Sequence, residues 1–221
     1  IAMHLGSQIV DTAPFLEGIA RLSDLVATLR RMGVSTLRVL DIGGGLGIRY
    51  AEERSLEPGP FAAAVVPPLR ALGLTVYLEP GRFLVGSAGV LLTRVLYRKH
   101  SGGKEFVVVD AGMNDLVRPS HYQAYHEILE LEEQGRPPLR ADIVGPVCET
   151  GDFLALDRMV PGLRAGDALA VLGAGAYGFV MASNYNSRPR PPEIMVDGGR
   201  WWVSRERETL GDLARGEKMA P

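Results

Sequence analysis

In the first third of the chain, segments with hydrophobic residues at helical spacing alternate with short apolar runs. Between residues 14 and 32 apolar side chains recur three or four positions apart, which predicts an amphipathic helix. Residues 37–42 form a short apolar run that predicts a strand. A second helix is expected over residues 60–72, interrupted at Pro67-Pro68 because proline cannot donate its backbone hydrogen bond. A second strand is expected over residues 74–78. Strands that alternate with helices predict parallel βα units.

The pattern changes after about residue 86, where short apolar runs separated by turn residues predict a β-rich region. The expected strands cover residues 90–97, 106–109, 141–144, 153–156, 168–172, 194–196 and 201–203. Asp197-Gly198-Gly199 predicts a hairpin turn between the last two of these strands. Residues 120–138 are polar, which predicts a surface excursion. The charged tail, residues 206–221, is expected to form a short helix or to fray.

Composition and charge exclude several classes of protein. The formal net charge of −2 gives no case for binding nucleic acid through bulk charge. No apolar run reaches the length of a membrane span, so no membrane partner is expected. A single cysteine is compatible with the cytoplasm. His100, His121 and His126 form no credible ligand set with that cysteine, so no metal is expected.

The lone cysteine, Cys148, lies in a glycine-bracketed loop, residues 145–152, next to Glu149. A single cysteine cannot form an internal disulfide, so it is either a small buried hydrophobe or a reactive group. Its carboxylate neighbours strengthen the case for a reactive group, so that on this loop alone the two interpretations are about equally favoured.

Three other segments carry candidate chemistry, each with a plainer alternative. Successive glycines after a strand, residues 43–45, let backbone N–H groups approach a phosphate, although a tight turn also explains them. Glu79 ends an apolar strand and either binds a ligand or pairs with Arg82. Arg118 is either a carboxylate-binding residue or an ordinary surface arginine. His4, taken alone, is more often structural than catalytic.

Five motifs occur together in a fixed order: His4-Leu5-Gly6-Ser7-Gln8, Asp41-Ile42-Gly43-Gly44-Gly45-Leu46-Gly47, Glu79-Pro80-Gly81-Arg82, the Cys148 loop and Gly175-Ala176-Tyr177-Gly178. From His4 to about Arg190 the chain resembles the fold-type III pyridoxal-phosphate decarboxylases, most closely those that act on diaminopimelate. The resemblance implies an α/β plus β fold. Residues 1–86 would be the C-terminal part of an alanine-racemase-like (β/α)8 barrel, and residues 87–221 a mostly antiparallel β domain.

The resemblance also implies a pyridoxal 5'-phosphate site. The cofactor would be held by His4, Ser7, Gly43, Gly44, Gly45, Glu79, Gly81, Arg82 and Tyr177. The ring of His4 would stack on the cofactor ring. Glu79 would face the pyridine nitrogen, where a negative charge favours the protonated ring. A protonated ring accepts electrons better, as loss of carbon dioxide requires.

The implied substrate is meso-diaminopimelate, which would lose carbon dioxide to give L-lysine in lysine biosynthesis. Its contacts would be Arg82, Arg118, Tyr122, Glu149 and Tyr177. Glu149 would bind the distal ammonium, and Cys148 would return a proton after decarboxylation. In the family this loop crosses a dimer interface, so a homodimer with shared active sites is implied. Cys148, Glu79 and His4 form the implied catalytic set.

One expected part of the family pattern is missing from this sequence. The family's cofactor lysine precedes the His4 segment, whereas Lys99, Lys104 and Lys218 have no comparable context. A complete (β/α)8 barrel also takes about 250 residues. We therefore expect a C-terminal portion of such an enzyme that is inactive alone.

Two alternative functions remain open. One is a related decarboxylase of ornithine, arginine or carboxynorspermidine. The ornithine enzymes generally carry aspartate after the cysteine, so Glu149 and the pair Arg118 and Tyr122 favour diaminopimelate. The other is a non-catalytic homologue that binds a protein partner, as antizyme inhibitors do. The retention of every other site element speaks against it.

Overall fold

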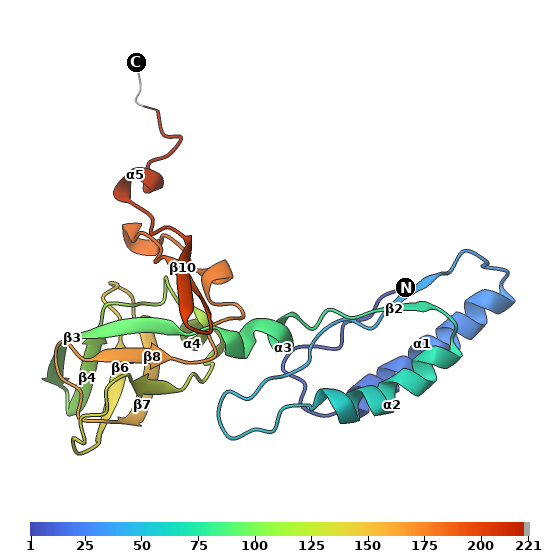
Figure 1. The fold of residues 1–221 in the computed structure, drawn as a ribbon, viewed down its shortest axis with the longest axis horizontal. Helices are drawn as coiled ribbons and strands as arrows, with labels where there is room; N and C mark the ends of the chain where they lie inside the picture. Colours follow the sequence, from blue (N-terminus) through green and yellow to red (C-terminus); the bar gives the residue numbers. More distant parts are fainter. Residues whose placement is uncertain (219–221) are drawn as a thin grey trace. The chain divides into compact units, whose positions relative to one another are not determined.

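The computed structural model describes residues 1–218, and the last three positions of the predicted tail lie outside the described residues. The chain divides into two compact units, Ile1–Ala88 and Gly89–Pro221 (Figure 1). No helix within the described part of the chain is long and apolar enough to cross a membrane.

The first unit is built from parallel strands and two long helices. Its elements are α1 (Ala13–Arg31), β1 (Val39–Asp41), α2 (Pro58–Ala71), β2 (Thr75–Tyr77), α3 (Gly81–Val85) and a 3-10 turn, η1 (Gly86–Ala88). Strand β1 pairs in parallel with β2, and Ala2 forms a further parallel bridge to Asp41. The predicted βα alternation is therefore confirmed, although each strand is shorter than its apolar run.

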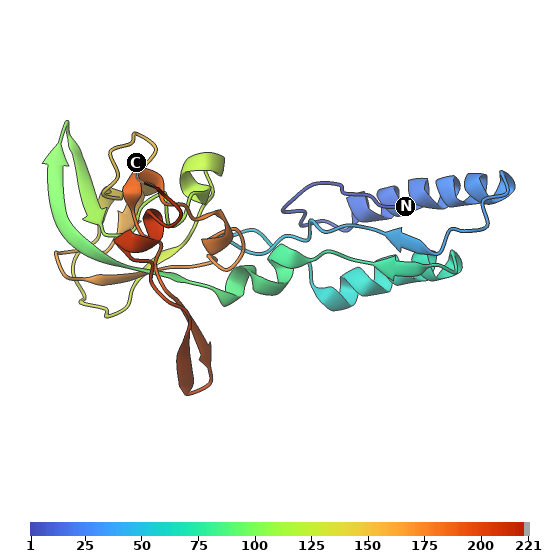
Figure 2. The ribbon, with the colours of Figure 1, turned by 90° about the horizontal axis from the view of Figure 1, so that it is seen from above.

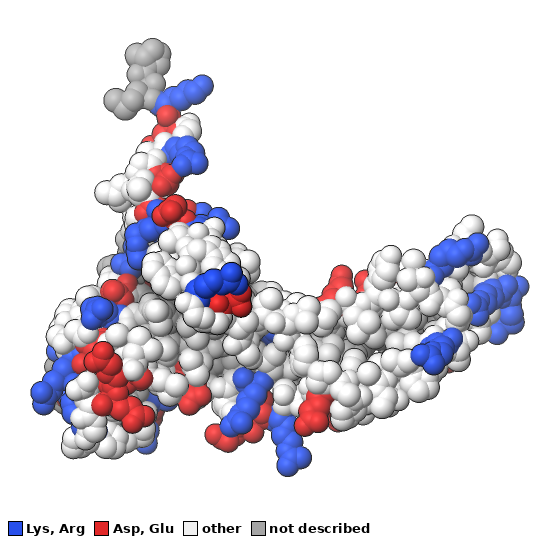
Figure 3. Space-filling model, viewed as in Figure 1, with Lys and Arg blue, Asp and Glu red and all other residues white. Residues whose placement is uncertain are grey.

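Helix α1 packs on α2 through an apolar face that the helical period predicts. Phe15 and Phe61 meet edge to face with ring centroids 5.1 Å apart, a geometry that aromatic pairs favour. Ile19 and Leu22 extend the buried face along α1. The arginines in the last turns of both helices gather at one end of this unit (Figure 3). Cations there complement the negative end of a helix dipole.

The predicted interruption of the second helix is wrong. Helix α2 runs through Pro67 and Pro68 without a break. Each proline removes one backbone donor, but Phe61, Val65 and Leu69 are all buried on the same side of the helix. Burial of side chains before and after the proline pair keeps the two halves of α2 in one continuous helix.

The second unit contains a six-stranded sheet in the order β5-β8-β3-β4-β6-β7. Its strands are β3 (Leu91–Ser101), β4 (Lys104–Val109), β5 (Ile128–Glu130), β6 (Leu139–Val144), β7 (Phe153–Val160) and β8 (Ala168–Val171). All neighbours are antiparallel except β4 and β6. The mostly antiparallel β-rich region is thus confirmed. The side chain of Arg158 on β7 donates to the carbonyl of His126, just before β5, at 2.8 Å, so the two edges of the sheet approach each other.

The core of this sheet consists of buried apolar residues from several of its strands, including Val107, Val109, Ile143, Leu154 and Leu169. Branched apolar side chains of this kind suit the buried face of a sheet. Strands β3 and β4 are joined by Gly102-Gly103, whose φ values of 58° and 78° are those of a two-residue hairpin turn.

The polar span 120–138 is more ordered than a surface excursion. It begins within α4 (Arg118–Tyr122) and includes edge strand β5. His126, in its middle, has no exposed surface. Elements this short fall below the length at which periodicity is readable.

The last part of the chain forms the predicted hairpin and a short helix. Strands β9 (Glu193–Asp197) and β10 (Arg200–Arg205) pair antiparallel, and their ribbon projects from the rest of the unit (Figure 2). Both tryptophans, Trp201 and Trp202, lie exposed on β10. Helix α5 (Leu210–Leu213) begins with a capping box formed by Thr209 and Asp212. Two 3-10 turns, η2 (Phe179–Met181) and η3 (Tyr185–Ser187), precede the hairpin.

Candidate functional site

The glycine run after β1 lies between two neighbouring backbone segments. A Cβ atom would come within 2.3 Å of the Met3 carbonyl oxygen at Gly43, 2.2 Å of that of Glu79 at Gly44 and 2.4 Å of that of Gly6 at Gly45. Backbone this close accepts only glycine. Close backbone packing, which the sequence did not predict, is therefore part of the explanation for this run.

The close packing of these backbone segments also brings His4 and Glu79, two residues predicted from the sequence, next to the glycine run. Glu79 donates its backbone N–H to the carbonyl of Gly43 at 2.9 Å. The Cα of His4 lies 3.3 Å from the position of a Cβ on Gly43. His4 and Glu79 thus flank the glycine run, and both are exposed.

Arg82 links Ser7, another predicted residue of this unit, to Tyr50. Its guanidinium donates to the Ser7 hydroxyl at 2.9 Å and to the Tyr50 hydroxyl at 2.6 Å. A Cβ on the preceding Gly81 would meet nothing within 4 Å. The result is a set of hydroxyl and guanidinium groups beside open backbone. Such a donor set fits a phosphate group. Tyr50 was not predicted from the sequence, because no local pattern links it to Arg82.

In the second unit the Cys148 loop is fixed by a buried carboxylate. Asp152 accepts the backbone N–H of Met113 at 2.6 Å and that of Val147 at 2.5 Å. Cys148 and Glu149 themselves are exposed. A rigid loop therefore presents a thiol and a carboxylate to solvent. The carboxylate at the end of the motif serves the backbone rather than the chemistry.

Glu149 has a defined orientation despite its exposure. One oxygen accepts the Tyr185 hydroxyl at 3.1 Å, and the other accepts the backbone N–H of Gly151 at 3.3 Å. The hydrogen bond to Glu149 and its negative charge raise the pKa of Tyr185. The carboxylate is thus held in place before any ligand arrives.

Arg118 is buried, so the reading of an ordinary surface arginine is wrong. Its relative exposure is 6%, and its guanidinium lies 2.8 Å from the Nε2 of His126. Tyr122, at the end of the same short helix, is exposed. Helix α4 also adjoins the Cys148 loop, because a Cβ on Gly151 would lie 2.6 Å from the Ser120 hydroxyl. The second unit therefore brings Arg118, Tyr122, Cys148 and Glu149 into one region.

Tyr177 is held in an unusual backbone conformation. Its φ is 58°, in the left-handed region that bulky residues seldom adopt. The following Gly178 passes so close to the Ala174 carbonyl oxygen that a Cβ would lie 2.2 Å from it. Strain of this kind persists where the surrounding structure enforces it, often at functional sites.

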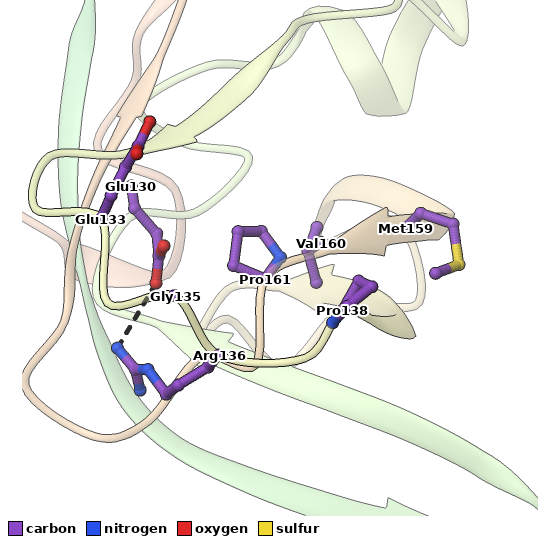
Figure 4. A pocket seen from close by; sticks show the side chains of 8 residues that line it. All are labelled: Glu130, Glu133, Gly135, Arg136, Pro138, Met159, Val160 and Pro161. Carbon is purple, nitrogen blue, oxygen red and sulfur yellow. Dashed lines mark hydrogen bonds and ion pairs between the residues drawn. The ribbon is translucent and has the colours of Figure 1, made fainter.

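A hollow elsewhere in the second unit does not include any predicted site residue (Figure 4). Its cavity volume is about 350 Å³, and it lies beside the ion pair of Arg136 and Glu130, whose charged atoms are 3.3 Å apart. Among residues 1–218 no group of three or more His, Cys, Asp or Glu side chains is arranged to hold a metal ion.

Known proteins resemble this chain over nearly its whole length. A family described as pyridoxal-dependent decarboxylase, C-terminal sheet domain, matches residues 9–175. The diaminopimelate decarboxylase of Pseudomonas aeruginosa is 49% identical over 218 residues, which are 99% of this chain and 52% of that protein. That of Aquifex aeolicus is 48% identical over 209 residues, which are 94% of this chain and 50% of that protein.

A solved structure agrees with these sequence matches. Diaminopimelate decarboxylase from Helicobacter pylori, complexed with L-lysine, superimposes with a TM-score of 0.90 at 41% identity. The match covers 97% of this chain and 53% of that one. The chain thus spans about half the length of the relatives that it matches.

Proposed function

This chain belongs to the pyridoxal-dependent decarboxylase family, and we propose that it is part of an enzyme that converts meso-diaminopimelate to L-lysine and carbon dioxide. The observation that carries the proposal is the oriented carboxylate of Glu149 directly after the exposed Cys148. A carboxylate fixed by Tyr185 can bind a distal ammonium of the substrate. The relatives called diaminopimelate decarboxylase support the same substrate.

We propose that residues 1–86 are the C-terminal part of a (β/α)8 barrel. The parallel pairing of β1 and β2 supports this, since such barrels contain only parallel strands. The carboxyl end of each strand leads into a site motif, β1 into the glycine run and β2 into Glu79. Barrel enzymes carry their active sites at that end of the strands.

The residues of the first unit fit pyridoxal 5'-phosphate. Its phosphate would be held by Ser7, Arg82 and the backbone of Gly43–Gly45 and Gly81, with the hydroxyl of Tyr177 as a further donor. When bound, the cofactor supplies an electron sink for the pair left by the departing carboxylate. Glu79 would hold a proton on the ring nitrogen, and His4 would stack on the ring.

The residues of the second unit would bind and protonate the substrate. Arg118, with Tyr122, and Arg82 would bind the carboxylate that is retained, and Glu149 the distal ammonium. The bond from carbon to the other carboxylate breaks and carbon dioxide leaves. Cys148 would then deliver its Sγ proton to that carbon. Because Cys148 and Glu149 are exposed at the tip of their loop, we place them in the active site of a second subunit, which makes the enzyme a homodimer.

The completed enzyme would work in the cytoplasm, where the lone Cys148 remains a free thiol. The test of the proposed function is turnover by the full-length protein with added cofactor. We expect L-lysine and carbon dioxide from meso-diaminopimelate, with much lower efficiency on ornithine or arginine. Equal or greater turnover of ornithine would overturn the proposed substrate. A structure with cofactor in which the phosphate contacts none of Gly43–Gly45, Gly81 and Tyr177 would overturn the proposed site.

A further inference from the structure

His126 is fully buried and has a defined partner on each ring nitrogen. Its Nδ1 lies 2.7 Å from the carbonyl oxygen of Leu172, and its Nε2 lies 2.8 Å from Nη1 of Arg118. A carbonyl only accepts, so Nδ1 carries the hydrogen. A guanidinium only donates, so Nε2 presents its lone pair. The two partners therefore select one neutral tautomer of the ring.

The backbone around His126 is fixed as well. Its carbonyl accepts Nη1 of Arg158 on β7 at 2.8 Å. The next residue, Glu127, accepts the backbone N–H of Leu172 at 2.8 Å, which extends the pairing of β5 with β8 by one step. The imidazole is thus held by the sheet from two sides, and its lone pair has a fixed direction.

Arg118 needs such a support, because its own element is short. It is the first residue of α4, a helix of five residues with no side-chain hydrogen bond at its N-cap. The long side chain leaves this single turn and reaches an acceptor that belongs to the sheet. A hydrogen bond to one of the five guanidinium N–H groups sets the plane of the whole group.

We propose that His126 is a positioning residue, which orients the guanidinium of Arg118 toward the carboxylate that the substrate retains. The inference rests on the proposed function, in which Arg118 binds that carboxylate. A guanidinium ordered in advance loses less freedom when the ligand binds. Removing the Nε2 acceptor should therefore weaken substrate binding more than it slows the chemical step.

The hydrogen bonds of the His126 ring can be tested without measuring enzyme activity. In full-length protein with ¹⁵N-labelled histidine, the nitrogen signals of His126, identified by their loss in His126→Asn, should be those of a neutral ring with hydrogen on Nδ1. A ring with hydrogen on Nε2, or a doubly protonated ring at neutral pH, would overturn the inference.

The role toward substrate is tested with a matched pair of variants. His126→Gln can place an amide oxygen near Arg118, whereas His126→Asn is too short to reach it but can still donate to Leu172. We expect His126→Asn to raise the KM for diaminopimelate about tenfold with little change in kcat. His126→Gln should recover most of that loss. Thermal unfolding of both variants shows whether they are equally stable.

A double-mutant cycle with Arg118→Met separates positioning from general packing. If His126 acts through Arg118, His126→Asn should hardly change KM once Arg118 is methionine. Additive effects on KM, with coupling seen only in the unfolding temperature, would show a purely structural pair and overturn the inference. If the wild type does not decarboxylate diaminopimelate, the proposed function fails and the role toward substrate fails with it. An active wild type with an uncoupled cycle refutes His126 alone.

Discussion

Replacing Glu149 by alanine is the sharpest test of substrate recognition. The carboxylate is held by the Tyr185 hydroxyl at 3.1 Å and by the Gly151 N–H at 3.3 Å. It is therefore oriented before it meets an ammonium group. A hydrogen bond to a charged group contributes roughly 1.5–3 kcal/mol. Solvent around this exposed side chain screens part of that energy, so the lower half of the range applies.

In the full-length enzyme with cofactor, Glu149→Ala should lower kcat/KM for diaminopimelate by about 10- to 50-fold, if the interaction acts in the transition state. The assay is the rate of L-lysine formation over a range of substrate concentrations. Glu149→Gln keeps the length and hydrogen-bonding capacity but loses the charge, so it should lose most of the same factor.

A matched control is Tyr185→Phe, which removes only the hydroxyl that orients Glu149. It should cost a smaller factor, about 2- to 10-fold, because Glu149 keeps its charge and its hydrogen bond from Gly151. If Glu149→Gln works as well as the parent enzyme, the charge is irrelevant and Glu149 is a packing element of its loop. The preference for diaminopimelate over ornithine would then lose its main support.

Three further predictions concern the fold and the cofactor. Gly44→Ala would place a methyl group 2.2 Å from the Glu79 carbonyl oxygen and should destabilise the protein by about 1–3 kcal/mol in denaturant unfolding. The control is Gly81→Ala, where a methyl group meets nothing within 4 Å, and an equal loss of unfolding free energy in both variants would contradict the close approach. The hydrogen bond from Arg190 lowers the pKa of Glu208 from 4.5 to about 2, so the ionised carboxylate stabilises the fold above pH 4.5 and this stabilisation is lost as the pH falls toward 2. Glu208→Gln should flatten the dependence of unfolding temperature on pH in that window, and an unchanged profile would contradict this role of Glu208. This chain alone, mixed with pyridoxal phosphate and borohydride, should show no modification confined to one of its three lysines and no decarboxylation; mass spectrometry that finds a single modified lysine, with turnover, would refute this.

The long helices and most strands could be predicted because each makes its own pattern. The helix expected at 14–32 lies at Ala13–Arg31, and every strand of the six-stranded sheet except β5 overlaps an expected apolar run. The break expected at Pro67-Pro68 did not occur. Proline weakens a helix locally, and only the tertiary burial on either side of the pair, invisible in the sequence, decides that the helix continues.

The candidate site was only partly predictable. Its motif residues are recognisable because they occur in short contiguous sequence motifs in a fixed order. The residues that hold them are not, since Tyr185 contacts Glu149 across 36 positions and His126 contacts Leu172 across 46. A hydrogen bond between distant positions leaves no local period or spacing. His126 in particular lies in a polar stretch that predicts only surface.

The exposed β9–β10 ribbon has a spectroscopic consequence. Trp201 and Trp202 are the only tryptophans of this chain, and they are 70% and 46% exposed. The tryptophan fluorescence of this chain therefore comes from a single hairpin that is in contact with water. Any surface that covers the ribbon should shift the emission of these two residues to shorter wavelength and protect them from a soluble quencher. The chain thus carries its own optical probe for contacts made by its last two strands.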